Sequence, residues 1–309
     1  MKNEILLEAI GGIDEDLLVR SETFAVSHRP LRRIAMIAAA VMLLAVTVFA
    51  SAAGIQYWLG RSEDGLYNTL NFRYELSPVS IRPEALEELT SALNDRWAED
   101  WEIVSEMDTY YYHALPYSET STALRGISDL EDFLGIDLLV TPELEASTLA
   151  YLEEAAPGSG SEHIHLHLYG PRREDAMEEY SDTGAITLQA IGVQIYLSGQ
   201  GTNCYGGLRI LIPLTEEFAE SCPQETWYSE LSDYQVEQTQ FGNVPVYLCT
   251  ADNASDRSTA LALYGDGSNG YYAYVATEPA KWSKEYPGGW VDDPMELLLP
   301  LIQNLASGE

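Results

Sequence analysis

The chain has 309 residues, with 49 acidic side chains against 16 basic ones and a formal net charge of −33. At 46% hydrophobic residues, the composition is typical of a folded protein and excludes a disordered chain. The charge excludes DNA and RNA as ligands, because binding to polyphosphate requires clustered lysine and arginine side chains that displace counterions.

Residues 34–55 form an apolar segment without a charge that is long enough to cross a lipid bilayer. A helix of these 22 residues measures roughly 33 Å at about 1.5 Å per residue, and a hydrocarbon core is about 30 Å thick. More arginines precede the segment than follow it closely: Arg20, Arg29, Arg32 and Arg33 against Arg61 and Arg73. Because basic flanks stay in the cytoplasm, the sequence predicts a single-pass membrane protein with a cytoplasmic N-terminus.

A cleaved secretory signal is the alternative interpretation of this segment. Ala50, Ser51 and Ala52 form an A-x-A site at its end, after which a signal peptidase could cut. Signal peptides begin with a short basic stretch, however, whereas 33 residues precede this apolar region. We therefore expect a cytoplasmic head of residues 1–33, an anchor of residues 34–55 in the lipid bilayer, and an extracytoplasmic region of residues 56–309.

The cytoplasmic head carries a helical pattern of its own. Residues 1–23 alternate apolar and charged positions at helical spacing, with a break at Gly11 and Gly12, which predicts two short helices. Helices this short are marginally stable alone in water. Their apolar stripe favours a cytoplasmic protein partner or the membrane face for residues 1–23, with a solvated leader as the alternative.

Residues 56–309 begin with alternating strand and helix patterns. Period-two alternation predicts a strand over residues 67–76, after a linker at residues 61–66. Apolar residues at helical spacing predict a helix over residues 83–97, and a strand follows over residues 101–107.

A short helix over residues 129–134 is predicted from its two ends. Ser128 and Glu131 have the spacing of a capping box, in which the two side chains satisfy free backbone amides of the first turn. Gly135 is placed to end the helix in the left-handed conformation that glycine tolerates.

The second half of the chain is dominated by predicted strands, and one hairpin among them has an identifiable turn. The sequence GDGSNG at residues 265–270 contains residues that tolerate positive φ, so it joins a strand over residues 259–264 to one over residues 271–276. Further strands are expected over residues 163–170, 185–198, 208–214 and 243–250.

A last helix is predicted near the C-terminus. Asp293 serves as its cap, Pro294 suits the first turn and Glu296 completes a capping box. Pro300 should kink or interrupt this helix, because proline lacks the amide donor that a helix interior uses.

Together these elements predict an α+β fold of antiparallel β-sheets with a few helices, preceded by one transmembrane helix. A polar, charge-rich stretch at residues 171–183 is the expected boundary between two subdomains, residues 62–175 and 184–309, with a single domain as the alternative.

Three histidines are the candidates for metal binding. His163, His165 and His167 alternate along a strand and share one of its faces, about 6.5 Å between neighbours. Two neighbours could share a zinc ion, but a third ligand would have to come from Glu162 or another strand, and no second histidine or cysteine pair has metal-site spacing. A solvated or half-buried strand face is therefore the favoured interpretation.

The cysteines of the chain are Cys204, Cys222 and Cys249, all in the region expected outside the cell, where disulfides persist. One bridge and one free thiol is the simplest arrangement, and which two residues pair stays open. Neither Cys204 nor Cys222 lies in a nucleophile motif, so a structural role is favoured over catalysis.

The remaining candidate motifs have simpler structural interpretations. Asp266, Ser268 and Asn269 superficially resemble a calcium loop, but the twelve-residue spacing and terminal glutamate are missing. Tyrosine-rich runs at residues 110–112 and 271–274 could line a carbohydrate or peptide groove, although tyrosine also suits half-buried strand faces. The hydrolase elbow, the phosphate loop and the zinc helix motifs are absent, so we assign no catalytic residue and no cofactor.

Several stretches carry a resemblance to a known class of proteins. They are EAIGGIDEDLLVRSE with HRPLRR before the alanine-rich segment, ISDLEDFLGIDLLVTPEL in the middle of the chain, and the C-terminal order of FGNVPVYL, a hairpin and MELLLPLIQNL. The chain resembles single-pass membrane proteins of clostridia-like Firmicutes that are described as anti-sigma factors or sigma-factor regulators. Its C-terminal part is similar to a domain of unknown function that ends many of them. The head departs from typical anti-sigma factors, since it has only 33 residues and no zinc-binding histidine and cysteine set.

The resemblance implies an outer domain that senses or binds a ligand and a head that holds a cytoplasmic partner. We therefore expect a membrane-anchored extracytoplasmic binding protein, without catalysis, that regulates a sigma factor or a similar partner. The alternatives are an envelope enzyme, such as a metal-assisted hydrolase, and a purely structural surface protein.

Overall fold

The computed structural model describes residues 54–62, 66–104, 110–115, 124–154, 164–222, 224–229, 234–253, 257–277 and 286–305. Its strands are β1 (Ile55–Arg61), β2 (Asn68–Tyr74), β3 (Tyr110–Leu115), β4 (Ile164–Arg172), β5 (Ala190–Leu197), β6 (Cys204–Pro213), β7 (Glu225–Ser229), β8 (Gln235–Phe241), β9 (Val244–Asn253), β10 (Arg257–Gly265) and β11 (Gly270–Thr277). Its helices are α4 (Pro83–Val104), α5 (Ile127–Leu134), α6 (Pro142–Glu154), α7 (Arg173–Thr183), α8 (Glu216–Glu220) and α9 (Met295–Ile302).

The strands form two antiparallel sheets. The large sheet has eight strands in the order β3-β4-β5-β6-β11-β10-β9-β8, and the small sheet has three in the order β1-β2-β7. The predicted α+β class with antiparallel sheets and few helices is therefore confirmed. No described helix is both long and apolar enough to cross a bilayer, and residues 34–53 of the expected anchor lie outside the described residues, as does the head.

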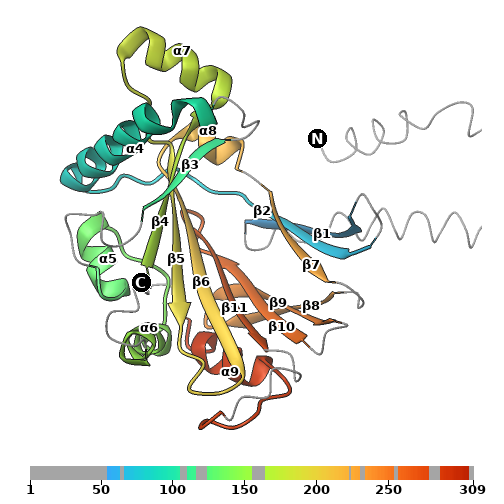
Figure 1. Ribbon diagram of the computed structural model, residues 1–309. Helices are drawn as coiled ribbons and strands as arrows, with labels where there is room; N and C mark the ends of the chain where they lie inside the picture. The colour runs from blue at the N-terminus through green and yellow to red at the C-terminus, as the bar shows by residue number, and fades with distance from the viewer. Residues whose placement is uncertain are drawn as a thin grey trace, which may run out of the picture. The chain divides into compact units, whose positions relative to one another are not determined.

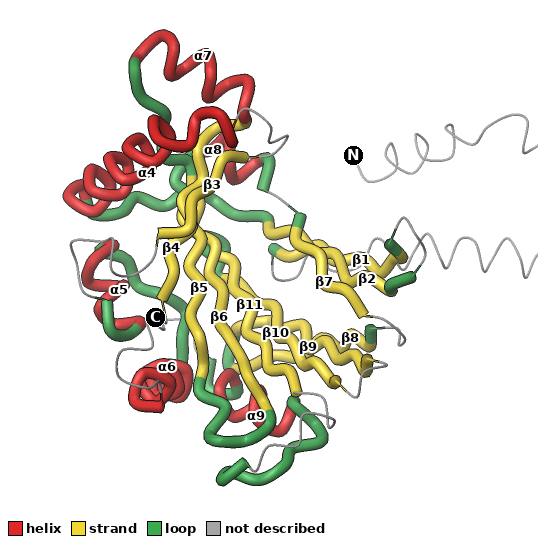
Figure 2. Tube along the Cα trace, viewed as in Figure 1, coloured by secondary structure: helices red, strands yellow, loops and turns green. Residues whose placement is uncertain are grey.

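The two faces of the large sheet are covered by different layers (Figures 1 and 2). Helices α4, α5, α6 and α9 pack on one face, where they share a core with alternate strand residues such as Leu166, Val193 and Ile210. The small sheet packs on the β8–β11 part of the other face through Ile55, Leu70, Phe72 and others. The other half of that face, made by β4, β5 and β6, carries the histidines and tyrosines between the apolar positions.

The predicted hairpin at residues 259–276 is confirmed down to its register. Thr259 lies opposite Ala276 and Tyr264 opposite Tyr271, with the turn between them. Asp266 closes this turn, because its Oδ1 atom accepts hydrogen bonds from the backbone amides of Ser268 and Asn269 at 2.8 and 2.6 Å.

The predicted strand at residues 67–76 is confirmed as β2, but its surroundings differ from the prediction. The helix expected over residues 83–97 continues to Val104 as α4, so the strand predicted from Trp101 is wrong at residues 101–104. Trp97, Trp101 and Val104 continue the helical spacing of the apolar residues before them, and this continuity outweighs the β-propensity of the segment. The strand β1 occupies Ile55–Arg61, so residue 55 of the expected anchor and residue 61 of the expected linker are strand residues.

Residues on both sides of the expected subdomain boundary contribute strands to the same sheet. The polar stretch at residues 171–183 contains helix α7, and β4 before it pairs antiparallel with β5 after it. The last helix, α9, follows the predicted cap, since Asp293 Oδ1 accepts from the amide of Met295 at 2.9 Å, and it continues through Pro300 to Ile302.

Helix α5 is capped by a distant residue instead of its own capping box. Its N-terminal residue Ile127 donates its amide to Glu145 Oε2 on α6 at 2.7 Å. Ser128 turns to the same carboxylate, at 3.3 Å from Oε1, and Glu131 instead accepts from the amide of Leu138 at 2.7 Å. The predicted capping box is therefore wrong, although Gly135 does end the helix at φ 71°, as expected.

We expect the substitution Glu145→Ala to lower the free energy of unfolding by about 1 kcal/mol, because it removes the acceptor of a helix-terminal amide. Ser128→Ala is the matched control and should cost less than about 0.5 kcal/mol. Urea denaturation followed by circular dichroism measures both. A larger loss in the serine variant than in the glutamate variant would contradict this assignment of the cap.

Candidate functional site

The candidate histidines that the structure describes have different surroundings. His165 and His167 lie on β4, on the face away from the helices, and His163 lies outside the described residues. The ring of His165 packs edge-on against Tyr196, with 5.6 Å between the ring centroids. His167 lines a pocket. Within the described ranges, no group of three or more His, Cys, Asp or Glu residues is placed to hold a metal ion.

The three cysteines are buried in two different layers, and no disulfide joins them. Cys204 packs in the core under the helices, whereas Cys222 and Cys249 pack in the core under the small sheet, so a bridge from Cys204 would have to join opposite faces of the large sheet. Burial raises the pKa of Cys222 to about 11 and that of Cys249 to about 12. Both thiols stay protonated at neutral pH and are poor nucleophiles.

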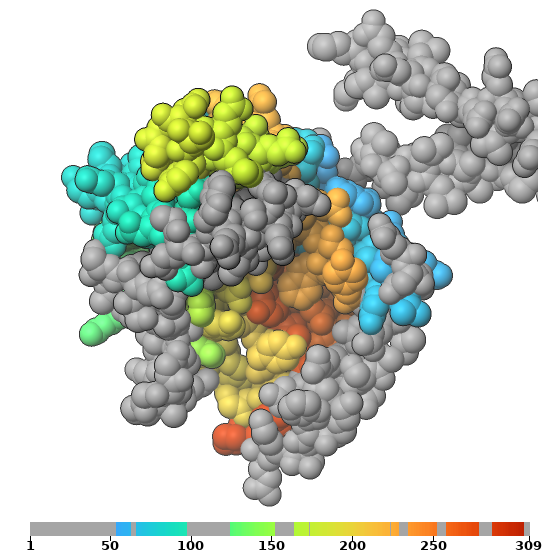
Figure 3. All heavy atoms as spheres, turned by 45° about the horizontal axis from the view of Figure 1, so that its top comes forward, coloured from blue at the N-terminus to red at the C-terminus, as the bar shows by residue number. Residues whose placement is uncertain are grey.

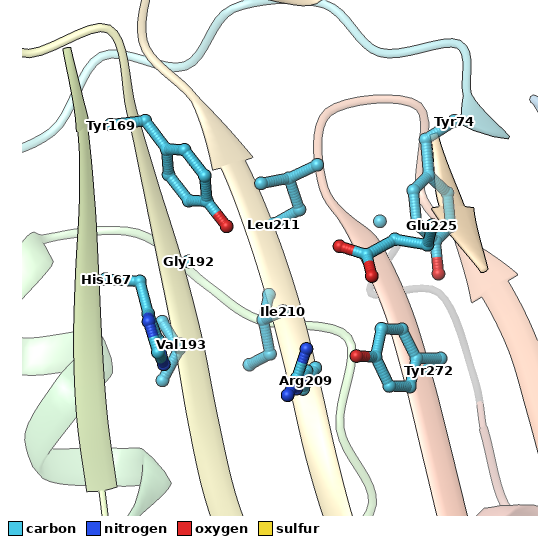
Figure 4. A pocket seen from close by; sticks show the side chains of 11 residues that line it. Tyr74, His167, Tyr169, Gly192, Val193, Arg209, Ile210, Leu211, Glu225 and Tyr272 are labelled. Carbon is cyan, nitrogen blue, oxygen red and sulfur yellow. The ribbon is translucent and has the colours of Figure 1, made fainter. Parts of the chain in front are cut away.

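A pocket of about 210 Å³ lies between the large sheet and the edge of the small sheet (Figure 4), and we call it the sheet pocket. In Figure 3 the surface is hollowed where β6 (yellow) and β11 (red) lie beside β7 (orange). The pocket is lined by Tyr74, His167, Tyr169, Gly192, Val193, Arg209, Ile210, Leu211, Glu225, Gly270 and Tyr272.

Strand register explains why these residues meet. His167, Gly192, Leu211 and Gly270 lie opposite one another on β4, β5, β6 and β11, so they form one row across the large sheet. The next row on the same face places Arg209 directly opposite Tyr272. Since side chains of neighbouring strands at one level are about 5 Å apart, residues that are distant in the sequence become neighbours.

Two glycines make room for the pocket. A Cβ atom at Gly192 would lie 3.0 Å from the ring of Tyr169, and one at Gly270 would lie 2.5 Å from the ring of Tyr74. Both tyrosine rings therefore lie against bare backbone, and the Tyr74 hydroxyl donates to the carbonyl of Tyr271 at 2.7 Å. Any side chain at these two positions would displace a pocket wall.

One basic and one acidic side chain face the sheet pocket. Arg209 lies over the ring of Tyr272, with 5.6 Å from its Cζ atom to the ring centroid, and Glu225 comes from the first position of β7 (Figure 4). Burial raises the pKa of the Glu225 carboxyl, and the Arg209 charge acts against this rise. Burial alone would lower the pKa of the Arg209 guanidinium, but the Tyr272 and Glu225 oxygens raise it overall. The two groups thus stabilise each other's charged forms.

Two tyrosines of the pocket, Tyr74 and Tyr272, remain neutral. Burial is the largest cause that raises the pKa of Tyr74 and of Tyr272, and the Glu225 charge raises both further. In Figure 4 the hydroxyls of Tyr169 and Tyr272 and the carboxylate of Glu225 are turned toward the cavity. The arrangement offers a cation, an anion and neutral hydroxyls within one small volume, which suits the orientation of a polar ligand.

Comparison of the sequence with known family models and with curated proteins gave no match.

Sequence reasoning singled out His167 and Tyr272 but missed Arg209, Glu225 and Tyr74. Arg209 is the single charged residue in the apolar strand LRILIP, and a charged residue within an apolar strand indicates a polar contact at that position. Nothing local marks Glu225, because its role depends on β7 joining β2, with Glu225 opposite Phe72.

We expect Arg209→Gln to raise the pKa of Glu225 further, because the arginine charge is what opposes the effect of burial. A carboxyl whose folded pKa exceeds its unfolded value, 4.5, binds more protons when folded, so stability falls as pH rises from about 4.5 through the raised pKa. In the variant this decline should extend to higher pH. Carbon-13 NMR titration of the Glu225 carboxyl, with Arg82→Gln as control, measures the shift; an unchanged or lower pKa would contradict the coupling.

Proposed function

We propose that residues 54–305 form an extracytoplasmic ligand-binding domain, anchored by residues 34–55, and that the sheet pocket binds a small zwitterionic ligand. The observation that supports the ligand is the placement of Arg209 and Glu225 on one tyrosine-lined pocket. In this proposal residues 1–23 hold a cytoplasmic protein partner, such as a sigma factor, and the domain acts as a sensor.

The size of the cavity limits the ligand. At about 30 Å³ for each water-sized group, a pocket of about 210 Å³ holds roughly seven such groups. This is the size of a free amino acid or a similar small metabolite.

The charges select the chemistry of the ligand. A guanidinium presents a planar fork of donors that matches a carboxylate, and Arg209 offers this group to the ligand. The Glu225 carboxylate accepts from an ammonium group, while the hydroxyls of Tyr169 and Tyr272 serve as neutral partners. A molecule that carries both a carboxylate and an ammonium therefore pairs with both charges at once.

The pKa directions of two tyrosines and of Arg209 suit these three groups to binding. Tyr74 and Tyr272 are held neutral, so neither acts as a base near neutral pH. Arg209 keeps its proton, because its pKa is raised from an already high value. These groups are suited to holding a ligand in place.

We expect the full-length protein in lipid nanodiscs to bind members of a free amino-acid panel, and Arg209→Gln to weaken binding at least about tenfold, or 1.4 kcal/mol. Isothermal titration calorimetry measures the affinity. Gly192→Ala should also weaken binding, since its new methyl group pushes Tyr169 into the cavity. Arg125→Gln, at an exposed position, is the matched control and should bind as the parent does.

Two results would count against this assignment of the pocket. One is the absence of saturable binding by any zwitterion, and the other is equal affinity for N-acetylated amino acids, which lack the ammonium group that Glu225 is proposed to accept. Hydrolysis of amides or esters by the purified protein would point instead to the enzyme hypothesis.

The proposed topology has its own test. We expect an alkaline phosphatase fused after Glu309 to be active in cells, because this reporter folds only outside the cytoplasm. Removing residues 34–53, which leaves β1 complete, should abolish that activity and release the fusion from the membrane fraction. An active cytoplasmic reporter at the same position, with inactive phosphatase, would overturn the topology.

A further inference from the structure

The small sheet has a second, outward face that carries a groove of its own. Strands β1, β2 and β7 turn Ile55, Leu70 and Phe72 toward the large sheet, so the alternate residues face away from it. These residues line an open groove of about 950 Å³, which we call the outer groove: Trp58, Gly60, Arg61, Ser62, Tyr67, Thr69, Asn71, Gln224, Thr226 and Tyr228. None of them lines the sheet pocket.

Strand register arranges the outer groove in two rows. Trp58 lies opposite Asn71, which lies opposite Thr226, and in the next row Thr69 lies opposite Tyr228. An aromatic ring thus stands on each outer strand, with small polar side chains between them on β2. From a strand spacing of about 4.8 Å and a rise of about 3.4 Å per residue, the Cα atoms of Trp58 and Tyr228 are roughly 12 Å apart.

Tyr228 is the exposed ring of the outer groove, whereas Trp58 and Tyr67 are half-buried. Tyr228 is 58% exposed, and its ring meets the edge of Tyr67 at 6.1 Å between centroids. Tyr67 is fixed in turn by its backbone, because its amide donates to Ser62 Oγ at 3.0 Å and its carbonyl accepts from the Ser62 amide at 2.9 Å. A ring that is exposed and already ordered loses little entropy when a ligand stacks on it.

Asn71 organises the polar centre of the outer groove. Its Nδ2 atom donates to Thr69 Oγ1 at 3.0 Å, and its Oδ1 atom accepts from Gln224 Nε2 at 2.7 Å and from Thr226 Oγ1 at 3.0 Å. Thr69 and Asn71 are 5% and 7% exposed, whereas Thr226 is half-buried and Gln224 is exposed, so the network runs from the core to the surface. The Thr69 hydroxyl keeps its own proton to donate, and Gln224 keeps its carbonyl oxygen to accept.

The described lining of the outer groove carries little charge. No carboxylate is among its described lining residues, although the chain carries a net charge of −33, and Arg61 is the cation among them. One arginine is too little for a polyanion, and the hydroxyl and amide groups at the centre would be left unpaired by an apolar protein surface. These described lining residues therefore favour a neutral ligand that has apolar faces and many hydroxyl groups.

We propose that the outer groove binds a neutral oligosaccharide. A hexose ring presents C–H groups on its faces, which pack against the electron-rich faces of Trp58 and Tyr228, and hydroxyls at its rim, which pair with Thr69 and Gln224. The span of roughly 12 Å between the two aromatic positions is that of a few linked hexoses, so a chain of sugars contacts both rings where a single sugar contacts one. This site is independent of the sheet pocket and of its proposed ligand.

The test uses the full-length protein in lipid nanodiscs, because the sugar headgroup of a maltoside detergent would compete for the outer groove. The probes are neutral hexasaccharides of cellulose, chitin and starch type, with polygalacturonate as the acidic comparison. We expect microcalorimetry to show saturable binding of a neutral hexasaccharide, and Tyr228→Ala and Trp58→Ala each to weaken it at least about tenfold.

Tyr228→Ala is the decisive variant, since the exposed position of Tyr228 leaves the fold intact, as circular dichroism would verify. Trp290→Ala, which removes another half-exposed tryptophan, is the matched control and should keep the parental affinity. Tyr228→Ala should also keep the affinity of the sheet pocket for its amino acid, which separates the two sites. The proposal is overturned if no neutral hexasaccharide binds, if both ring variants retain affinity, or if polygalacturonate or an apolar peptide binds better.

Discussion

The architecture depends on how the two faces of the large sheet are covered. Helices cover one face, and the small sheet covers only part of the other face. On the helical face, alternate residues such as Leu166, Val193 and Ile210 make a continuous apolar core. On the other face, β1, β2 and β7 reach over β8–β11, while β4, β5 and β6 extend beyond them. The sheet pocket lies at this margin, where a buried apolar interface gives way to polar side chains.

The placement of Arg209 follows from that margin. Arg209 lies on a central strand, but its side chain is exposed, so its guanidinium keeps contact with water while it meets its partners. Tyr272 supplies a ring beneath it and Glu225 supplies the opposite charge from the small sheet. The site is therefore assembled only when the two sheets pack together, and Gly270 permits this close approach by giving the ring of Tyr74 bare backbone to lie on.

Much of the fold could be predicted from the sequence, because alternation and turn chemistry are local. The hairpin register around residues 265–270, the strand of the histidines and the start of α4 follow from patterns within ten or so residues. The cap of α5 could not be predicted, because Glu145 comes from the next helix. Ser128, which lies beside the capped amide of Ile127, is a plausible local cap in the sequence. The sheet pocket was missed for the same reason: Arg209 and Glu225 belong to different sheets, and only the crossing of β7 to β2 brings them together.

The two proposed sites recognise their ligands by different chemistry. In the sheet pocket, recognition rests on the opposite charges of Arg209 and Glu225, which the packing of the two sheets brings together. In the outer groove, recognition falls to ring faces and to a preorganised neutral network around Asn71. Both sites share β2 and β7, whose alternate residues face opposite ways: Glu225 faces the pocket and Thr226 the groove. A single strand of five residues thus contributes to two unrelated modes of binding, since the side chains of a β-strand alternate between its faces.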